Sequence, residues 1–101
     1  MYGTIAHFRI KPGFKDEFIK AMDSLGDASI PGWKADYYFQ MNDDPEEFYL
    51  VAVFQDRDAY EANADSPDQH ERYLIFREFL VEDPQWNDGW IVSATGPDVQ
   101  A

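Results

Sequence analysis

The feature that most constrains this chain is an unbroken run of seven apolar or aromatic residues, FYLVAVF, at positions 48–54. Such a run is typical of a strand that is buried on both faces. A polar turn with Asp56 and Asp58 follows it, and Tyr60 then lies in the first turns of an expected helix. Helices can cover one face of the strand. In a chain of 101 residues, we expect a second copy of the chain to cover the other face.

The composition predicts a single folded domain. Hydrophobic residues make up 45% of the chain and aromatic residues 17%, which is enough for one core. The 20 acidic and 8 basic residues give a net charge of −12. This charge argues against nucleic acid and anionic membranes as partners, because both are bound through Lys and Arg. We interpret the acidic surplus as a solvated exterior.

The sequence also predicts a cytoplasmic location. No apolar run approaches the ~20 residues that a membrane-spanning helix needs. The first residues lack the basic and apolar segments of a secretory signal. The chain has no cysteine, which fits a reducing compartment.

Hydrophobic periodicity predicts an alternating order of strands and helices. We expect strands at 2–11, 33–41, 48–55 and 89–95, a helix at 14–25, and a helical region at 57–82. Within the last region, Ser66 and Pro67 favour the start of a new helix.

This order predicts an α+β, ferredoxin-like βαββαβ fold. Its sheet would have four antiparallel strands, with the helices on one face. The other face would carry Tyr49, Val51 and Val53, which are too apolar to remain in water, so we expect a face-to-face homodimer. Residues 1–96 would form this domain, and residues 97–101 a flexible tail.

Four segments carry a resemblance to a known family: FRIKPG at 8–13, PGW at 31–33, FQDRDAY at 54–60 and SP at 66–67. On these segments, residues 2–95 resemble the antibiotic biosynthesis monooxygenase (ABM) family of the dimeric α/β-barrel superfamily. The resemblance implies a homodimer with a pocket between the helices and the sheet of each subunit. It further implies that the pocket takes a small hydrophobic molecule and needs no cofactor.

Strand alternation, applied to the implied pocket, assigns a set of mainly aromatic side chains to it. The set is Ala6, Phe8, Tyr37, Phe39, Leu50, Phe54, Tyr60, Tyr73, Phe76 and Trp90. We expect seven of them to contact the substrate, namely Phe8, Tyr37, Phe39, Leu50, Phe54, Phe76 and Trp90.

The resemblance bears on two activities within the family. Quinone-forming members have a Trp at the position of Phe54, a Tyr at that of Tyr60 and an Asn at that of Leu50. This chain keeps the Tyr and an aromatic ring but lacks the Asn. Haem-degrading members would have an Asn, a Trp and a haem-ligating His near Ala6, Asn63 and Tyr73, and none of these is present.

Four polar side chains are candidates for catalysis: Tyr60, Arg72 and Tyr73, with His70 as a proton shuttle at the rim. The first three could orient an electron-rich substrate and stabilise its anion for reaction with oxygen. The alternative is that both tyrosines pack in the core with their hydroxyls at the surface.

Other candidate sites have structural explanations. His7 would lie at the dimer interface, and two histidines on separate elements give no metal signature. The acidic turn at 43–47 lacks the ligand spacing of a calcium loop. Trp86 and Trp90 could stack on a planar ligand or cap the core. We therefore expect no metal and no cofactor.

The sequence thus favours a cofactor-independent monooxygenase that acts on a small, planar, quinol-like substrate. A non-catalytic, ligand-binding or stress-associated homodimer of the same fold is the alternative. An isomerase or decarboxylase of the same superfamily is a third possibility, and it would need an ionisable group in the pocket, such as His70.

Overall fold

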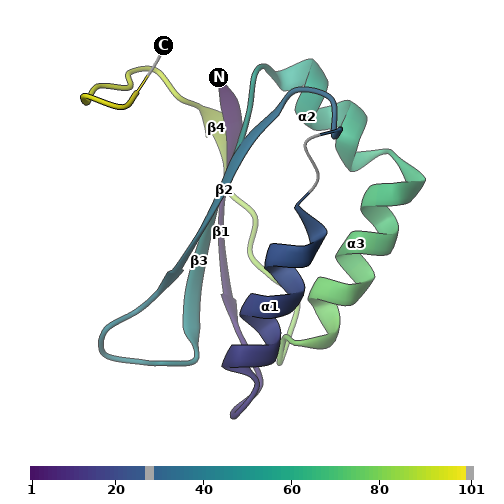
Figure 1. Cartoon of the computed structure of the whole chain (residues 1–101), viewed down its shortest axis with the longest axis vertical. Coiled ribbons are helices and arrows are strands. Elements are labelled where there is room, and N and C mark those ends of the chain that lie inside the picture. Colours follow the sequence, from purple (N-terminus) through teal and green to yellow (C-terminus); the bar gives the residue numbers. More distant parts are fainter. Residues whose placement is uncertain (27–28, 100–101) are drawn as a thin grey trace.

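The computed structural model describes residues 1–26 and 29–99 and confirms the α+β, ferredoxin-like architecture. The elements in chain order are β1 (Tyr2–Arg9), α1 (Lys15–Leu25), β2 (Trp33–Gln40), β3 (Glu47–Phe54), α2 (Arg57–Ala64), α3 (Pro67–Glu78) and β4 (Asp88–Trp90). The sheet order is β2-β3-β1-β4, and each neighbouring pair is antiparallel. All the helices lie on one side of the sheet (Figure 1).

The helical region divides where its sequence predicts. Asp56 caps α2, since its Oδ1 accepts a hydrogen bond from the Ala59 amide at 2.8 Å. Ser66 caps α3 in the same way, its Oγ accepting from the Gln69 amide at 3.1 Å, and Pro67 is the first helical residue. These caps fix the residues at which the two helices begin.

The core lies between the sheet and the helices. Phe18 of α1, which is fully buried, is its centre. The rings of Phe8, Phe48 and Phe76 lie around it with centroids 5.5 to 6.2 Å away. Because β1 and β3 pair with Ala6 opposite Leu50, even-numbered residues of both strands face this core.

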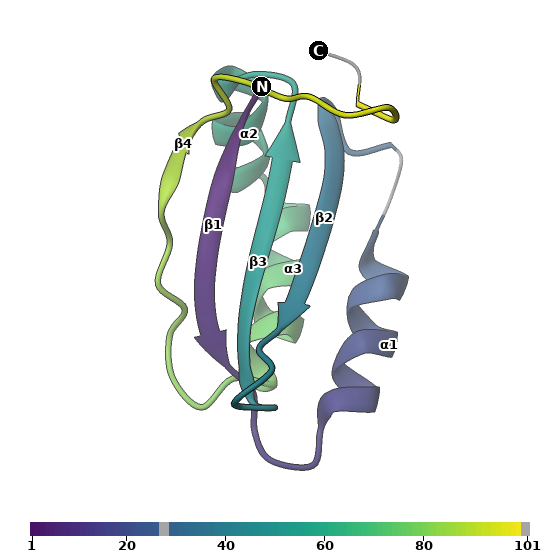
Figure 2. The ribbon, with the colours of Figure 1, turned by 90° about the vertical axis from the view of Figure 1, so that its left-hand side faces the viewer.

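Among the described residues, no helix lies over the opposite face of the sheet (Figure 2). Ile5, Tyr37 and Phe39 are 53%, 56% and 53% exposed there, and Tyr49 and Val51 are half-buried. The segment after β4 leaves the sheet on this side and crosses the end of the sheet near the N-terminus (Figures 1 and 2). We call this surface the open face. The apolar run at 48–54 predicts that this face is apolar, as the structure shows.

In β2, the side chains that face the helices are not the ones that the sequence predicts. A bulge between Trp33 and Ala35 shifts the register of β2, so that Tyr38 lies opposite Leu50 and Tyr37 opposite Val51. Tyr37 and Phe39 therefore lie on the open face, and the prediction that they face the pocket was wrong.

Several boundaries also differ, two of them by more than two residues. The final strand spans residues 88–90 instead of 89–95, and α3 ends at Glu78 instead of residue 82. The chain leaves α3 early because Leu80 forms a β-bridge with Ile10, which draws it back along the end of β1. Residues 100 and 101 of the expected tail lie outside the described residues. No described helix has the length and apolar character to cross a membrane.

Phe18→Ala should lower the free energy of unfolding by about 3 to 5 kcal/mol, because it leaves a cavity among closely packed rings. Chemical denaturation of the variant and the wild type measures the difference. Leu74→Ala is the matched control, since Leu74 is 47% exposed on α3 and should cost far less. Equal losses at the two positions would contradict this description of the core.

Candidate functional site

A cavity of about 690 Å³ lies between the helix-facing side of the sheet and the helices. The three helices and four strands of the described residues, and the segment before β4, all contribute to its wall. Its apolar lining includes Met22, Leu25, Leu50, Ala52, Phe54 and Phe76. The cavity is thus an extension of the core that is large enough for a small aromatic molecule.

The candidate catalytic residues all line this cavity. Tyr60 comes from α2, and His70, Arg72 and Tyr73 come from α3. Side chains one turn apart on a helix lie on the same face, which explains why Gln69, Tyr73 and Phe76 reach the cavity together. His70 is exposed at its rim.

The expected substrate-contacting residues divide into two groups. Leu50, Phe54 and Phe76 line the cavity. Phe8 does not, because its ring is buried in the core, with its centroid 5.0 Å from that of Phe76. Trp90 does not either: it is 58% exposed, and its ring packs edge-on against Tyr2 at 4.9 Å.

Tyr38 and Trp86 line the cavity, whereas the predicted residues Tyr37 and Trp90 do not. Tyr38 lines the cavity because the β2 bulge turns it, and not Tyr37, toward the helices. Trp86 also lines it, with its ring centroid 6.4 Å from Tyr73 and 6.3 Å from Phe76. The cavity therefore keeps the aromatic character predicted for it, with partly different residues.

Tyr60 is held in one orientation. Its ring packs against Tyr2 and Phe54, with centroids 5.3 and 5.5 Å away. Its hydroxyl donates a hydrogen bond to Asp88 Oδ1 at 2.9 Å. Burial, and then the bond to Asp88, raises the pKa of the Tyr60 phenol well above its ordinary value. Tyr60 is therefore protonated at neutral pH, with its hydrogen directed at Asp88.

Arg72 is positioned by two neutral groups. Its Nε donates to Gln69 Oε1, and its Nη2 donates to Asn63 Oδ1, both at 3.1 Å. Within residues 1–26 and 29–99, no carboxylate lies within salt-bridge distance of it. The guanidinium thus has no ion-pair partner among these residues and keeps free N–H groups beside the cavity.

A second carboxyl group lines the far wall. Trp33 Nε1 donates to Asp36 Oδ1 at 3.0 Å, and both residues border the cavity. Desolvation raises the pKa of the Asp36 carboxyl above its ordinary value. Burial and the charges of Asp36 and Asp23 raise the pKa of the Tyr38 phenol.

Sequence reasoning missed Thr4, Asp36 and Asp88 as cavity residues. Thr4 and Asp88 come together only because β1 and β4 pair with these two residues opposite each other. Asp36 faces the helices only because of the β2 bulge. The even-residue alternation of β1 could have identified Thr4, whereas the other two depend on pairing that the sequence does not display.

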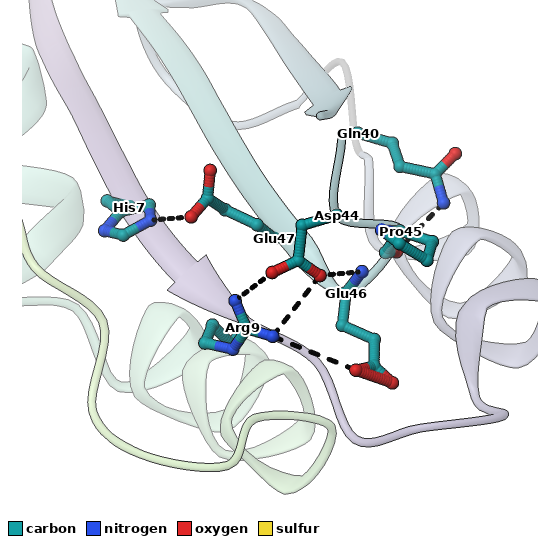
Figure 3. Close-up of polar contacts among 7 residues, drawn as sticks. All are labelled: His7, Arg9, Gln40, Asp44, Pro45, Glu46 and Glu47. Atoms are coloured by element: carbon teal, nitrogen blue, oxygen red, sulfur yellow. Dashed lines mark hydrogen bonds and ion pairs between the residues drawn. The ribbon is translucent and has the colours of Figure 1, made fainter. Parts of the chain in front are cut away.

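The charged residues of the open face form a separate structural group (Figure 3). Arg9 binds Asp44 through Nη1–Oδ2 and Nη2–Oδ1 contacts of 2.6 and 3.3 Å, which lowers the pKa of the Asp44 carboxyl. His7 stacks on Tyr49, with its Nε2 3.4 Å from Glu47 Oε2. These contacts fix the turn between β2 and β3 to β1.

The described part of the chain offers no site for a metal ion, since no three His, Cys, Asp or Glu side chains gather there. The carboxylate of Asp44 in the acidic turn is directed at Arg9. Its neighbour Glu46 also approaches Arg9, at 3.8 Å.

Comparisons with known proteins agree with this fold. The model of the antibiotic biosynthesis monooxygenase family matches residues 1–73. No curated protein matches the chain. Among solved structures, a mutant of SnoaB, a cofactor-independent oxygenase from Streptomyces nogalater, has a TM-score of 0.79 and 16% identity, covering 96% of this chain and 97% of its own. A Nitrosomonas europaea protein assigned to the same family has a TM-score of 0.77 and 22% identity, covering 94% and 93%.

The raised pKa of Asp36 predicts an effect on stability. A carboxyl with a raised pKa in the folded state contributes stability below its unfolded pKa of about 3.9 and loses it as the pH rises. Asp36→Asn should therefore increase the free energy of unfolding at pH 7, but only slightly, because the side chain is exposed to solvent, and the gain should shrink toward pH 3. Denaturation at several pH values measures it, with Asp43→Asn on the exposed turn as the control. A destabilised Asp36→Asn variant at pH 7 would contradict the prediction.

Proposed function

Because the chain belongs to the antibiotic biosynthesis monooxygenase family, we propose that it is a cofactor-independent monooxygenase for a small, planar aromatic or quinol-like substrate. The observation that carries the proposal is the aromatic cavity in which Tyr60, Arg72 and Tyr73 meet. The likeness to SnoaB, a cofactor-independent oxygenase, supports the reaction type.

The proposed chemistry needs no electron carrier, because the substrate is itself the reductant. An electron-rich ring system that has lost a proton can pass an electron to molecular oxygen. In an anthrone, the ring CH₂ carbon then forms a bond to one oxygen atom. Its two hydrogens leave with the other oxygen atom as water, and a quinone remains. The protein has to orient the substrate, exclude water and stabilise the anion.

The residues of the cavity supply these three contributions. The rings of Phe54, Phe76 and Trp86 would hold a flat substrate and keep water away from it. Arg72 carries a positive charge that could stabilise an anion, and Gln69 and Asn63 hold it in place. Tyr73 lines the same wall and would donate a hydrogen bond to a substrate oxygen.

Arg72→Gln and Tyr73→Phe should each lower the rate of oxygen uptake with an anthrone or hydroquinone at least tenfold, because each removes a donor to the developing anion. An oxygen electrode measures the rate. Tyr37→Phe, on the open face, is the matched control and should react at the wild-type rate. Turnover that is indifferent to both cavity substitutions, or absent on every substrate tested, would remove the enzymatic proposal.

A non-catalytic role is the second candidate, favoured by Leu50 and Phe54. At these positions quinone-forming relatives would have Asn and Trp, so two polar groups of that site are absent. Such a protein would be stabilised thermally by planar ligands without consuming oxygen. An isomerase or decarboxylase of the same superfamily would depend on an ionisable group in the cavity, such as His70.

We further propose that the protein is a cytoplasmic homodimer, formed through the open face by the domain at residues 1–96. The exposed side chains Ile5, Tyr37 and Phe39, with Tyr49 and Val51 beside them, make this face apolar. Water at such a surface is unfavourable, whereas a second copy would bury both faces at once.

The dimer proposal predicts that Ile5→Asp weakens association at least tenfold, because it would bury an unpaired carboxylate at the centre of the face. Sedimentation equilibrium measures the dissociation constant. Leu74→Asp, on the outer side of α3, should leave association unchanged. A wild-type chain that is monomeric and fully folded in dilute solution would refute the dimer.

A further inference from the structure

We propose that Thr4, Tyr60 and Asp88 form a hydrogen-bond acceptor site at one end of the cavity, which selects aromatic ligands that carry a neutral hydroxyl group. This inference rests on the proposed function, because it takes the cavity as the place where the ligand binds. It adds the chemical group that the ligand must carry and assigns roles to two residues outside the predicted site.

At this end of the cavity, Tyr60 and Asp88 present hydrogen-bond acceptors to a ligand and no donor. Tyr60 has one hydroxyl hydrogen, and it lies on the 2.9 Å bond to Asp88 Oδ1. The Tyr60 oxygen is therefore left with lone pairs only. The Asp88 carboxylate has no hydrogen, and its Oδ2 also presents lone pairs. Both groups can accept a hydrogen bond from a ligand, and neither can donate one.

Thr4 gives an independent sign that a ligand belongs here. Thr4 is only 4% exposed and lines the cavity, yet within the described chain its Oγ1 has no hydrogen-bond partner. An interaction of its hydroxyl with the Tyr60 oxygen lowers the pKa of the Tyr60 phenol slightly, but the two groups do not reach the geometry of a hydrogen bond. A buried hydroxyl without a partner is costly, and a ligand oxygen placed between Thr4 and Asp88 would supply one.

The three residues converge through separate parts of the fold. Thr4 and Asp88 lie opposite each other on β1 and β4, and Tyr60 reaches them from α2. The rings of Tyr2 and Phe54 hold Tyr60 on both sides, so the acceptor group is preorganised before any ligand arrives.

Charge decides which donors the site accepts. Asp36, Glu61, Asp65 and Asp88 line the cavity, against the single guanidinium of Arg72 in the described lining. A ligand that enters as an anion would meet this surplus of carboxylates, so a carboxylate-bearing ring should bind weakly. A phenol enters neutral and donates its hydrogen to Asp88.

Asp88 holds this hydrogen without removing it from an ordinary phenol. A phenol ionises about six pKa units above a carboxylic acid, so complete transfer would be strongly unfavourable. The proton stays on the ligand oxygen in a charge-assisted hydrogen bond, which is among the stronger kinds. Asp88 and Thr4 are therefore positioning residues, and the anion that reacts with oxygen forms later, near Arg72.

The test compares 1-naphthol with its methyl ether, 1-methoxynaphthalene, and with 1-naphthoate by titration calorimetry under argon. The wild type should bind naphthol about tenfold more tightly than the ether, because only naphthol donates a hydrogen bond. Naphthoate should bind more weakly than naphthol. Since oxygen is absent, a failure of the proposed oxygenation leaves this measurement unaffected.

Two substitutions locate the effect. Asp88→Asn should reduce the preference for naphthol over the ether to below about threefold, while Asp43→Asn, with the same loss of charge on the distant turn, should retain it. Thr4→Val should weaken naphthol binding and yet raise the melting temperature of the ligand-free protein, because it removes an unpartnered buried hydroxyl. A purely structural threonine would not give these opposite signs.

Equal affinities for naphthol and its ether in the wild type would overturn the acceptor site, as would no binding of naphthol. An unchanged preference in Asp88→Asn, or an unchanged affinity for naphthol in Thr4→Val, would overturn the assignment to that residue. If the protein prefers naphthol to the ether but takes up no oxygen with any anthrone or hydroquinone, the acceptor site is supported and the proposed oxygenation is contradicted.

Discussion

The structure depends on a sheet whose two central strands are apolar on both faces while helices cover only one of them. The side toward the helices collapses around Phe18, and its rings form the core. Near the start of β1 and the end of β3 the packing is looser, and the cavity opens there between sheet and helices. The opposite face keeps exposed apolar side chains. Core, cavity and open face are thus consequences of one alternation of side chains along β1 and β3.

The parts of the fold that local physics dictates could be predicted from the sequence. The run at 48–54 identified β3, and Asp56, Ser66 and Pro67 marked the helix starts that the structure confirms. The element order then gave the strand order. The sequence could not predict which side chains of β2 face the helices, because this depends on how β2 pairs with β3. A single extra residue near Trp33 reversed the faces of β2, and the period of two along the strand looked the same either way.

The candidate site shows the same division. Tyr60, Arg72 and Tyr73 lie on α2 and α3, where helical spacing brings side chains to one face, and all three line the cavity. Thr4 and Asp88 are polar residues at positions where local patterns predict only strand, and they became visible through the β1–β4 register. The unpartnered hydroxyl of Thr4 costs stability in the ligand-free protein. Such costs are common where a fold is adapted to hold a ligand.

The central claim is that the space between sheet and helices is the place where an aromatic ligand binds. The most direct measurement is an amide chemical-shift titration of the ¹⁵N-labelled protein with 1-naphthol. The account predicts that the largest changes fall on Thr4, Tyr60, Tyr73 and Asp88, while Tyr37 and Phe39 stay unchanged. Changes centred on the open face, or none at saturating ligand, would contradict it.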